Sequence, residues 1–187
     1  MRNRIQQIVT LSLFPAFLIG AGIASHAQSL RAVDIEAEEQ QSEELITQSI
    51  DDEREQSAPG AAKLTSDPAL VEMARARSYA MAHGAPFAHE DDAGRFVADG
   101  MVRARFGHYG SVGENIMMEQ DAARAFDPET LARRAVRGWM NSEGHRANIL
   151  SRLYTRTGVG VVVNGSHAYA TQLFWGPAAP RNNRRQP

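Results

Sequence analysis

Apolar residues recur every three or four positions in residues 70–81, which is the spacing of one face of an α-helix. Ser66-Asp67-Pro68 stands just before this stretch and combines a capping side chain with an early proline, and Gly84 ends the pattern. Residues 91–106 show the same spacing less regularly. The pattern predicts a first helix packed on a core and a second, weaker helix after it.

A further helix is predicted from Asp127-Pro128-Glu129, which places a capping carboxylate, a proline and an acidic residue at its first turn. Its apolar stripe includes Trp139, which we expect in the core. Ser142 can then cap a short helix that extends to Leu150. Two helices are therefore expected, joined at residue 142.

The sequence most typical of β-strands comes late in the chain. Residues 158–163 and 168–175 are rich in β-branched and aromatic residues, and the Asn164-Gly165 pair between them tolerates the positive φ of a tight turn. This pattern predicts a β-hairpin. Because the helices come first and the clear strands last, we expect an α+β fold in which helices cover an antiparallel sheet.

The first 27 residues are predicted to be a secretory signal peptide. A basic start is followed by an apolar run over residues 8–24 and by Ser25-His26-Ala27, which has small residues where a signal peptidase cleaves. The alternative is an uncleaved membrane anchor, since the run has 17 residues and a spanning helix needs roughly 17 to 25. Pro15 in the middle of the run favours cleavage. We expect a secreted or periplasmic protein with no membrane span after cleavage.

Residues 28–62 are predicted to be an acidic, disordered linker. Between residues 34 and 55 there are ten acidic residues against one basic residue, Arg54, and few large aliphatic residues. Such a segment buries too little apolar surface to offset the entropy lost on ordering. We expect a solvated spacer with at most a transient helix at Ile46 and Ile50. The alternative is a specific acidic docking arm.

A folded domain is expected over residues 63–176, followed by a basic, Pro-rich tail over residues 177–187. The whole chain has a formal net charge of -2, and the expected domain is close to neutral, so nucleic acid is not an expected partner. The absence of cysteine excludes disulfides, lipoprotein attachment and thiol catalysis. Any metal would need His and carboxylate ligands.

Three polar residues stand beside the predicted core: His89 after the first helix, Glu114 at a Gly-rich turn, and His145 between the last two helices. Two imidazoles and a carboxylate are adequate ligands for a divalent cation such as zinc, with water completing the shell. Their spacing forms no short metal motif. The alternative is a structural role, with Glu114 accepting backbone hydrogen bonds and His145 in the first turn of the short helix.

Serine hydrolase chemistry is a second enzymatic hypothesis. It would use Ser142 or Ser111 as the nucleophile and a histidine as the base. The chain has no G-x-S-x-G elbow, and Ser142 is better used as a helix cap. We therefore assign no catalytic residue from the sequence.

Several short motifs occur in the order in which a known family carries them, over about residues 64–175. Together they resemble the CAP superfamily of cysteine-rich secretory proteins, antigen 5 and pathogenesis-related 1 proteins, and specifically its cysteine-free bacterial SCP-like branch. The matching pieces are Ala88-His89, Gly113-Glu114-Asn115-Ile116, Trp139-x-x-Ser142-x-Gly144-His145-Arg146-Ala147-Asn148-Ile149-Leu150, Gly158-Val159-Gly160-Val161 and Tyr169-Ala170-Thr171-Gln172-Leu173-Phe174-Trp175.

The resemblance implies a three-layer α–β–α sandwich with a central antiparallel sheet, and a cavity lined by a His/Glu/Glu/His tetrad that can hold a divalent metal. His89 and Glu114 match the first His and the first Glu of this tetrad. Ser142 stands in place of the second Glu, and Tyr169 stands in place of the final His. Half of the tetrad is therefore retained, and a metal site would need a further ligand.

His145 is typical of the bacterial branch, and the resemblance implies that it points into the same cavity and compensates in part for the lost ligands. The expected metal ligands are then His89, Glu114 and His145. Asn115 and Gln172 are expected just outside the cavity, where they satisfy buried backbone groups.

The resemblance implies no single reaction, so three functional hypotheses stay open. The leading one is a secreted, non-enzymatic protein whose cavity binds a small apolar ligand, an envelope component or a partner, with or without a divalent cation. The second is a metal-dependent hydrolase of peptide or cell-envelope material, in which Glu114 or His145 activates water. The third is a structural envelope protein that the acidic spacer holds away from the membrane.

Overall fold

The structure, a computed structural model, describes residues 18–108, 110–120 and 127–178. The chain forms two compact units, residues 1–34 and residues 35–187. The second unit contains the sheet, the candidate site and most of the described helices.

The two ends assigned from the sequence lie largely outside the described residues. The predicted signal peptide, residues 1–27, and the predicted tail, residues 177–187, are each described only in part. No helix in the described portion of the chain is long and apolar enough to cross a membrane. Cleavage after residue 27 stays a prediction.

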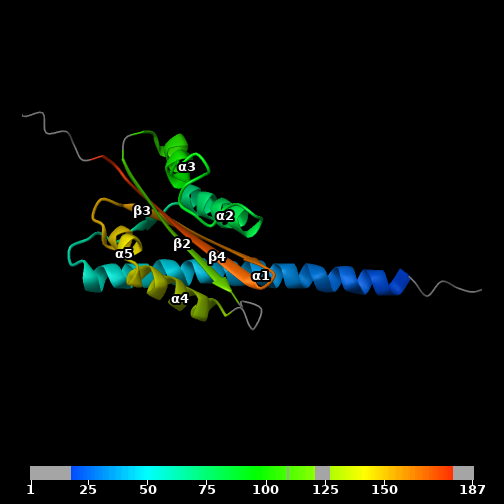
Figure 1. The fold of residues 1–187 in the computed structure, drawn as a ribbon. Coiled ribbons are helices and arrows are strands. Elements are labelled where there is room, and N and C mark those ends of the chain that lie inside the picture. Colours follow the sequence, from blue (N-terminus) through cyan, green and yellow to red (C-terminus); the bar gives the residue numbers. More distant parts are fainter. Residues whose placement is uncertain (1–17, 109, 121–126, 179–187) are drawn as a thin grey trace, which may run out of the picture. The chain divides into compact units, whose positions relative to one another are not determined.

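A four-stranded sheet forms the middle layer of the domain (Figure 1). β4 pairs antiparallel with both β2 and β3, and the short β1 pairs parallel with β3, so the sheet is mixed where an antiparallel one was expected. In spatial order the strands are β1 (Thr65–Ser66), β3 (Arg156–Asn164), β4 (His167–Gly176) and β2 (Ser111–Gln120).

Helices cover both faces of this sheet, which confirms the predicted α+β sandwich (Figure 1). In the described part of the second unit, one face carries α2 (Pro68–Ala82) and α3 (Val97–Phe106). The other face carries α4 (Pro128–Asn141), α5 (Glu143–Leu150) and the part of α1 (Leu18–Ser57) that follows residue 34.

The capping residues identified in the sequence begin the helices as predicted. The Asp67 carboxylate accepts the backbone N–H of Ala69 at 3.0 Å at the start of α2. The Asp127 carboxylate accepts the backbone N–H of Thr130 at 3.0 Å at the start of α4. Each bond satisfies a donor that the first helical turn leaves without a partner.

The weaker helix predicted over residues 91–106 begins later than expected, at Val97. Asp91 Oδ1 accepts the backbone N–H groups of Ala93 and Arg95, at 2.9 Å and 3.0 Å, and these bonds close a turn. Gly94 supplies the positive φ of 71° that this turn uses. The local turn therefore replaces the first part of the predicted helix.

Two glycines of β3 allow α2 to pack directly against the sheet. A Cβ atom added at Gly158 would lie 2.2 Å from the backbone of Leu70, and one added at Gly160 would lie 2.1 Å from the backbone nitrogen of Arg75. On the opposite face, Trp139 is 1% exposed and donates from Nε1 to the carbonyl of Ile116 at 3.0 Å. The prediction that Trp139 belongs to the core is confirmed.

The segment predicted as a disordered linker, residues 28–62, is helical over most of its length and ends in contact with the core. Within α1, Ile46 and Ile50 are buried in the core formed with α4, α5, β3 and β4. Arg54 is 1% exposed and donates to the carbonyl oxygens of Ile149 and Ser151, at 2.6 Å and 2.8 Å. The segment is therefore not the solvated spacer that was expected. A few aliphatic residues on one face of a helix are enough to hold the helix in place when that face packs against the core of a folded domain.

Candidate functional site

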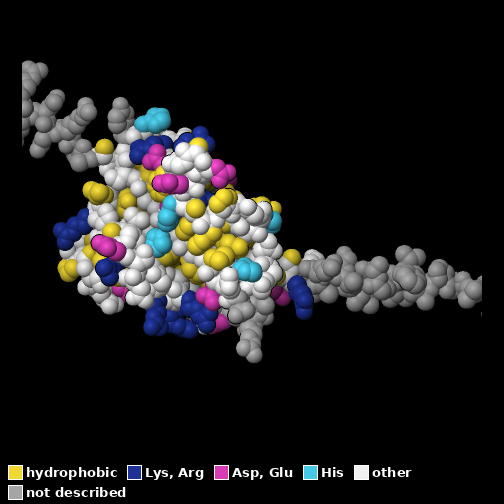
Figure 2. Space-filling model, in the orientation of Figure 1, with side chains coloured by type: hydrophobic (Ala, Val, Ile, Leu, Met, Phe, Trp, Pro, Cys, Tyr) yellow, Lys and Arg dark blue, Asp and Glu magenta, His cyan; other side chains and the backbone are white. Residues whose placement is uncertain are grey.

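A cleft of about 600 Å³ crosses the outer edge of β2, where the loop after α2 approaches the junction of α4 and α5. Figure 2 shows histidine side chains at the surface beside hydrophobic side chains on the face seen there. The cleft thus offers polar and apolar contacts side by side. Its lining includes His89, Phe96, Val112, Glu114, Ser142 and His145.

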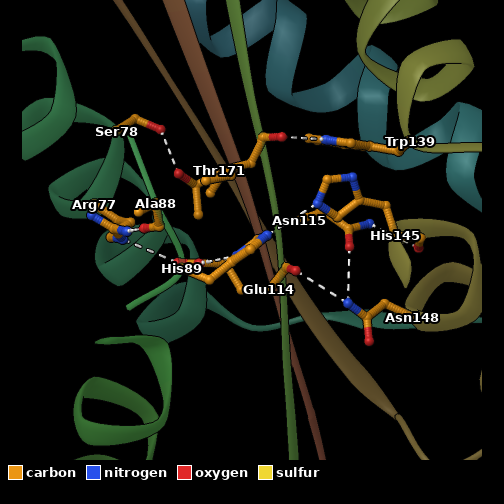
Figure 3. Close-up of polar contacts among 11 residues, drawn as sticks. Arg77, Ser78, Ala88, His89, Glu114, Asn115, Trp139, His145, Asn148 and Thr171 are labelled. Carbon is orange, nitrogen blue, oxygen red and sulfur yellow. Dashed lines mark hydrogen bonds and ion pairs between the residues drawn. The ribbon is translucent and has the colours of Figure 1, made fainter. Parts of the chain in front are cut away.

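His89 and Glu114 are in direct contact on the side of β2 that faces α2 (Figure 3). His89 Nδ1 lies 2.7 Å from Glu114 Oε2, and Glu114 Oε1 accepts from Arg77 Nε at 3.1 Å. The Glu114 side chain is fully buried, and that of Arg77 is 5% exposed. A buried carboxylate is costly without a counter-charge, so the ion pair with Arg77 is what makes the burial of Glu114 tolerable.

His145 approaches His89 from the opposite side of β2 (Figure 3). The two Nε2 atoms are 3.2 Å apart, and the rings meet edge to face with their centroids 5.3 Å apart. His145 lies in the first turn of α5, and its backbone carbonyl accepts from Asn115 Nδ2 at 3.3 Å. The structure therefore brings His89, Glu114 and His145 together, although 56 positions separate the two histidines.

A chain of amide side chains runs from the lining of the cleft into the interior. Asn148 Nδ2 donates to the carbonyl of Glu114 at 3.1 Å and to Asn115 Oδ1 at 3.0 Å. Asn115 Nδ2 reaches Gln172 Oε1 at 3.5 Å, and Gln172 Nε2 donates to Thr157 Oγ1 at 3.2 Å. Asn115 and Gln172 are both fully buried. Neither residue lines the cleft, and the hydrogen bonds of this chain link α5, β2, β4 and β3.

Ser142 and Tyr169 stand at the two positions where the resemblance implies lost ligands, and they differ in their position relative to the cleft. Ser142 lines the cleft and stands at the N-cap position of α5 as predicted, although its side chain makes no capping hydrogen bond there. Tyr169 is in register with Met118 and stacks on His167 at a centroid distance of 6.4 Å. Tyr169 is not among the residues that line the cleft.

Burial and a neighbouring imidazole perturb His145. Burial lowers its pKa from the ordinary value of 6.5, the nearby His89 lowers it further, and Glu114 acts in the opposite direction. Near neutral pH the lowered pKa favours the uncharged imidazole, which carries a hydrogen on one ring nitrogen only.

The residues present do not fit the three-ligand metal site that the resemblance implies. Both Glu114 oxygens are engaged, one with Arg77 and one with His89 Nδ1, so the carboxylate faces the other ring nitrogen of His89 and not the contact with His145. Within the described residues, no group of three or more His, Asp or Glu is arranged to hold a metal ion. Two imidazoles are fewer than the three or four protein ligands that zinc ordinarily takes.

Four residues of the site were not singled out from the sequence: Arg77, Phe96, Val112 and Asn148. A signal for Arg77 was present, because it falls on the buried stripe of α2 together with Ala74 and Met81. A charged residue at a core position is expected to have a buried partner. No pattern in the sequence indicates that this partner is Glu114.

A central sheet between two helical layers, with a buried Glu114 bound to His89 at the edge of the sheet, defines a CAP-type domain. The chain belongs to this family: the family model described as "CAP: Cysteine-rich secretory protein family" matches residues 47–175. The match begins inside α1, in agreement with the burial of Ile50 and Arg54.

Bacterial proteins are among the relatives. The chain is 37% identical over 122 residues to the uncharacterized protein YkwD of Bacillus subtilis, a match that covers 65% of this chain and 43% of YkwD. An extracellular SCP-domain protein of Bacillus anthracis has a similar structure, with a TM-score of 0.55 and 26% identity over 74% of this chain and 41% of that one. Both relatives are therefore more than twice as long as the matching region.

An outer surface protein of Borrelia burgdorferi shares the fold over most of its length. The TM-score is 0.59 at 13% identity, and the match covers 73% of this chain and 92% of that protein. At this identity the similarity establishes the fold alone.

Proposed function

We propose that this protein is a secreted, non-enzymatic CAP module that binds a small ligand or a partner group in the cleft at His89 and His145. One observation carries the proposal: two imidazoles from distant parts of the chain face each other across the edge of β2, beside apolar Phe96 and Val112. A cleft with a few convergent polar groups on an apolar wall is the common form of a ligand site.

The arrangement favours binding over hydrolysis. Glu114 is the carboxylate that a metal-dependent hydrolase would need as a ligand or base, and here it is held by Arg77 and His89. Ser142 lines the cleft but makes no side-chain hydrogen bond to either histidine among the described contacts, so an activated nucleophile is not assembled. The metal-dependent hydrolase is therefore the less favoured hypothesis.

Secretion is supported by the sequence at the N-terminus and by one relative. Residues 1–27 have the features of a cleaved signal, and the similar protein of Bacillus anthracis is described as extracellular. N-terminal sequencing of the exported protein is expected to start at Gln28.

The binding proposal is tested by nuclear magnetic resonance on the purified protein with isotope-labelled histidine. Small amphipathic compounds and extracts of cell envelope are added, and the side-chain resonances of His89 and His145 are followed. We expect a binding compound to shift both sets of resonances, and His145→Ala to abolish the shift. Arg146→Ala, at the neighbouring exposed position, is the matched control.

Two outcomes would overturn the proposal. One is that compounds bind with unchanged affinity to the folded His145→Ala variant. The other is that nothing in the panel shifts the histidine resonances at millimolar concentration.

A further inference from the structure

Arg77 joins three parts of the site. It lies on the buried face of α2, its Nε donates to Glu114 on β2, and its Nη2 donates to the carbonyl of Ala88, the residue before His89 (Figure 3). The Arg77 side chain is 5% exposed, so these contacts take place away from solvent. One buried guanidinium therefore fixes the carboxylate that His89 contacts and the backbone that carries His89.

The contacts of Glu114 determine where His89 carries its hydrogen. An ionised carboxylate has no hydrogen to donate, so the 2.7 Å contact between Glu114 Oε2 and His89 Nδ1 requires a hydrogen on Nδ1. Arg77 is the ion-pair partner of Glu114, so the contact needs only this one hydrogen on the His89 ring. Its Nε2 then has a lone pair and acts as a hydrogen-bond acceptor toward the cleft.

The same reasoning gives the contact between the histidines a direction. His89 Nε2 is an acceptor, so His145 Nε2, 3.2 Å away, is the donor. Hydrogen bonds therefore run one way, from His145 to His89 and from His89 to Glu114, and Arg77 holds the far end of this chain.

We propose that Arg77 is the positioning residue of this site. By holding Glu114 and the backbone before His89, it sets the direction of the hydrogen bond between the two histidines, and this direction makes the cleft selective for a neutral hydroxyl group. The hydroxyl oxygen would lie between the two histidines, donating to His89 Nε2 and accepting from His145 Nε2. This assignment rests on the proposed function, that the cleft binds a ligand.

The selectivity follows from what each head group can offer. A hydroxyl both donates and accepts, so it satisfies both histidines. A carboxylate only accepts and would leave His89 Nε2 without a donor, and an ammonium only donates and would leave His145 without an acceptor. Admitting the oxygen requires the two nitrogens to move apart by roughly 1–2 Å. The His89 side chain is 40% exposed, and the carbon chain of the ligand would lie against Phe96 and Val112.

The positioning role is tested without any ligand, by measuring which nitrogen of His89 carries the hydrogen in protein labelled with nitrogen-15 at histidine. We expect His89 to carry its hydrogen on Nδ1 in the wild-type protein and in Arg77→Lys. In Arg77→Gln we expect the Nδ1–H form to be lost or to be mixed with the Nε2–H form. Arg75→Gln is the matched control, because Arg75 lies on the same helix and also binds a carboxylate, that of Glu43, away from the cleft.

Either of two results would overturn the positioning role. One is an Nε2–H form of His89 in the wild-type protein, a readout that does not depend on whether any variant folds. The other is an unchanged His89 hydrogen position in a folded Arg77→Gln protein.

The ligand class is tested with octan-1-ol, octanoate and octylammonium, which share a chain length and differ in the head group. Binding is followed through the His89 and His145 resonances. We expect octanol to bind at least about tenfold more tightly than either ion, and this preference to disappear in Arg77→Gln. The preference should be kept in Arg75→Gln.

Equal or tighter binding of octanoate or octylammonium would overturn the hydroxyl assignment, and so would failure of octanol to bind. Failure of octanol alone leaves the wider binding proposal standing if other compounds shift the histidine resonances. Failure of every compound overturns both, whereas the position of the His89 hydrogen still decides the role of Arg77.

Discussion

Glu43 of α1 accepts the backbone N–H of Val161, on the outer edge of β3, at 3.0 Å. The same carboxylate is paired with Arg75 of α2 at 2.5 Å, and Glu39, one helical turn earlier, accepts the N–H of Val163 at 2.6 Å. Exposed N–H groups on an edge strand invite pairing with another chain. Two glutamates of α1 therefore take the place of a further strand beside β3.

We expect Glu43→Ala to destabilise the protein by about 1–3 kcal/mol, because it leaves the buried N–H of Val161 without an acceptor and Arg75 without its partner. Glu43→Gln should cost less, since an amide oxygen can still accept from Val161. The measurement is the free energy of unfolding in urea. Glu44→Ala, at the exposed neighbouring position, is the control, and an equal loss in both variants would contradict the role given to Glu43.

The contacts of Glu43 also explain why part of the fold was not predictable from the sequence. Ten acidic residues against one basic residue between residues 34 and 55 indicate a solvated segment when they are counted along the chain. Some of these carboxylates have partners more than a hundred positions away, as Glu43 has in Val161. Composition cannot reveal such partners. By contrast, the helices that begin at Pro68 and Pro128 follow from local capping and were predicted correctly.

The candidate site, like the fold, was predictable from the sequence only in part. The motif residues His89, Glu114 and His145 were identified from the sequence, and the structure brings them together. The expectation that Glu114 serves as a metal ligand did not allow for Arg77, which comes from another helix and occupies one of its oxygens. Short sequence motifs identified the three residues. Which groups the Glu114 carboxylate binds depends on tertiary contacts, and those motifs do not show them.

Close packing of α2 on β3 makes Gly160 a position where a single methyl group should be costly. A Cβ atom there would lie 2.1 Å from the nitrogen of Arg75 and 2.3 Å from the carbonyl carbon of Ala74, and both are backbone atoms that cannot rotate away. We expect Gly160→Ala to lower the free energy of unfolding by at least about 2 kcal/mol. Gly138→Ala, where no atom lies within 4 Å of the added Cβ, should not destabilise. Similar unfolding midpoints for the two variants would show that the helix does not approach the sheet so closely.

Stability is expected to depend on pH through His145. Its pKa is lowered from 6.5 by burial and by His89, so the unfolded chain binds a proton more readily than the folded one. The contribution of His145 is therefore complete above pH 6.5 and declines as the pH falls through 6.5 toward the lowered value. Chemical unfolding between pH 5 and 8 measures this dependence.

The decline should be shallower in His145→Gln, because the group that gains the proton on unfolding is then missing. His83→Gln, at an exposed position outside the cleft, is the matched control for replacing a histidine. Identical slopes for the wild-type protein and His145→Gln would contradict a lowered pKa at His145.

Removal of divalent metal is expected to leave the protein unchanged. The ion would find His89 Nε2 and His145 Nε2, 3.2 Å apart, but not the carboxylate of Glu114, which is bound to Arg77 and to the other nitrogen of His89. Two imidazoles on partly exposed side chains form a weak site compared with the three or four ligands of ordinary zinc centres. EDTA should therefore leave the melting temperature unchanged, and protein purified without a His-tag should retain far less than one equivalent of zinc. Near-stoichiometric zinc in the wild-type protein that is lost in His89→Ala would contradict this expectation and would mean that Glu114 exchanges Arg77 for the metal.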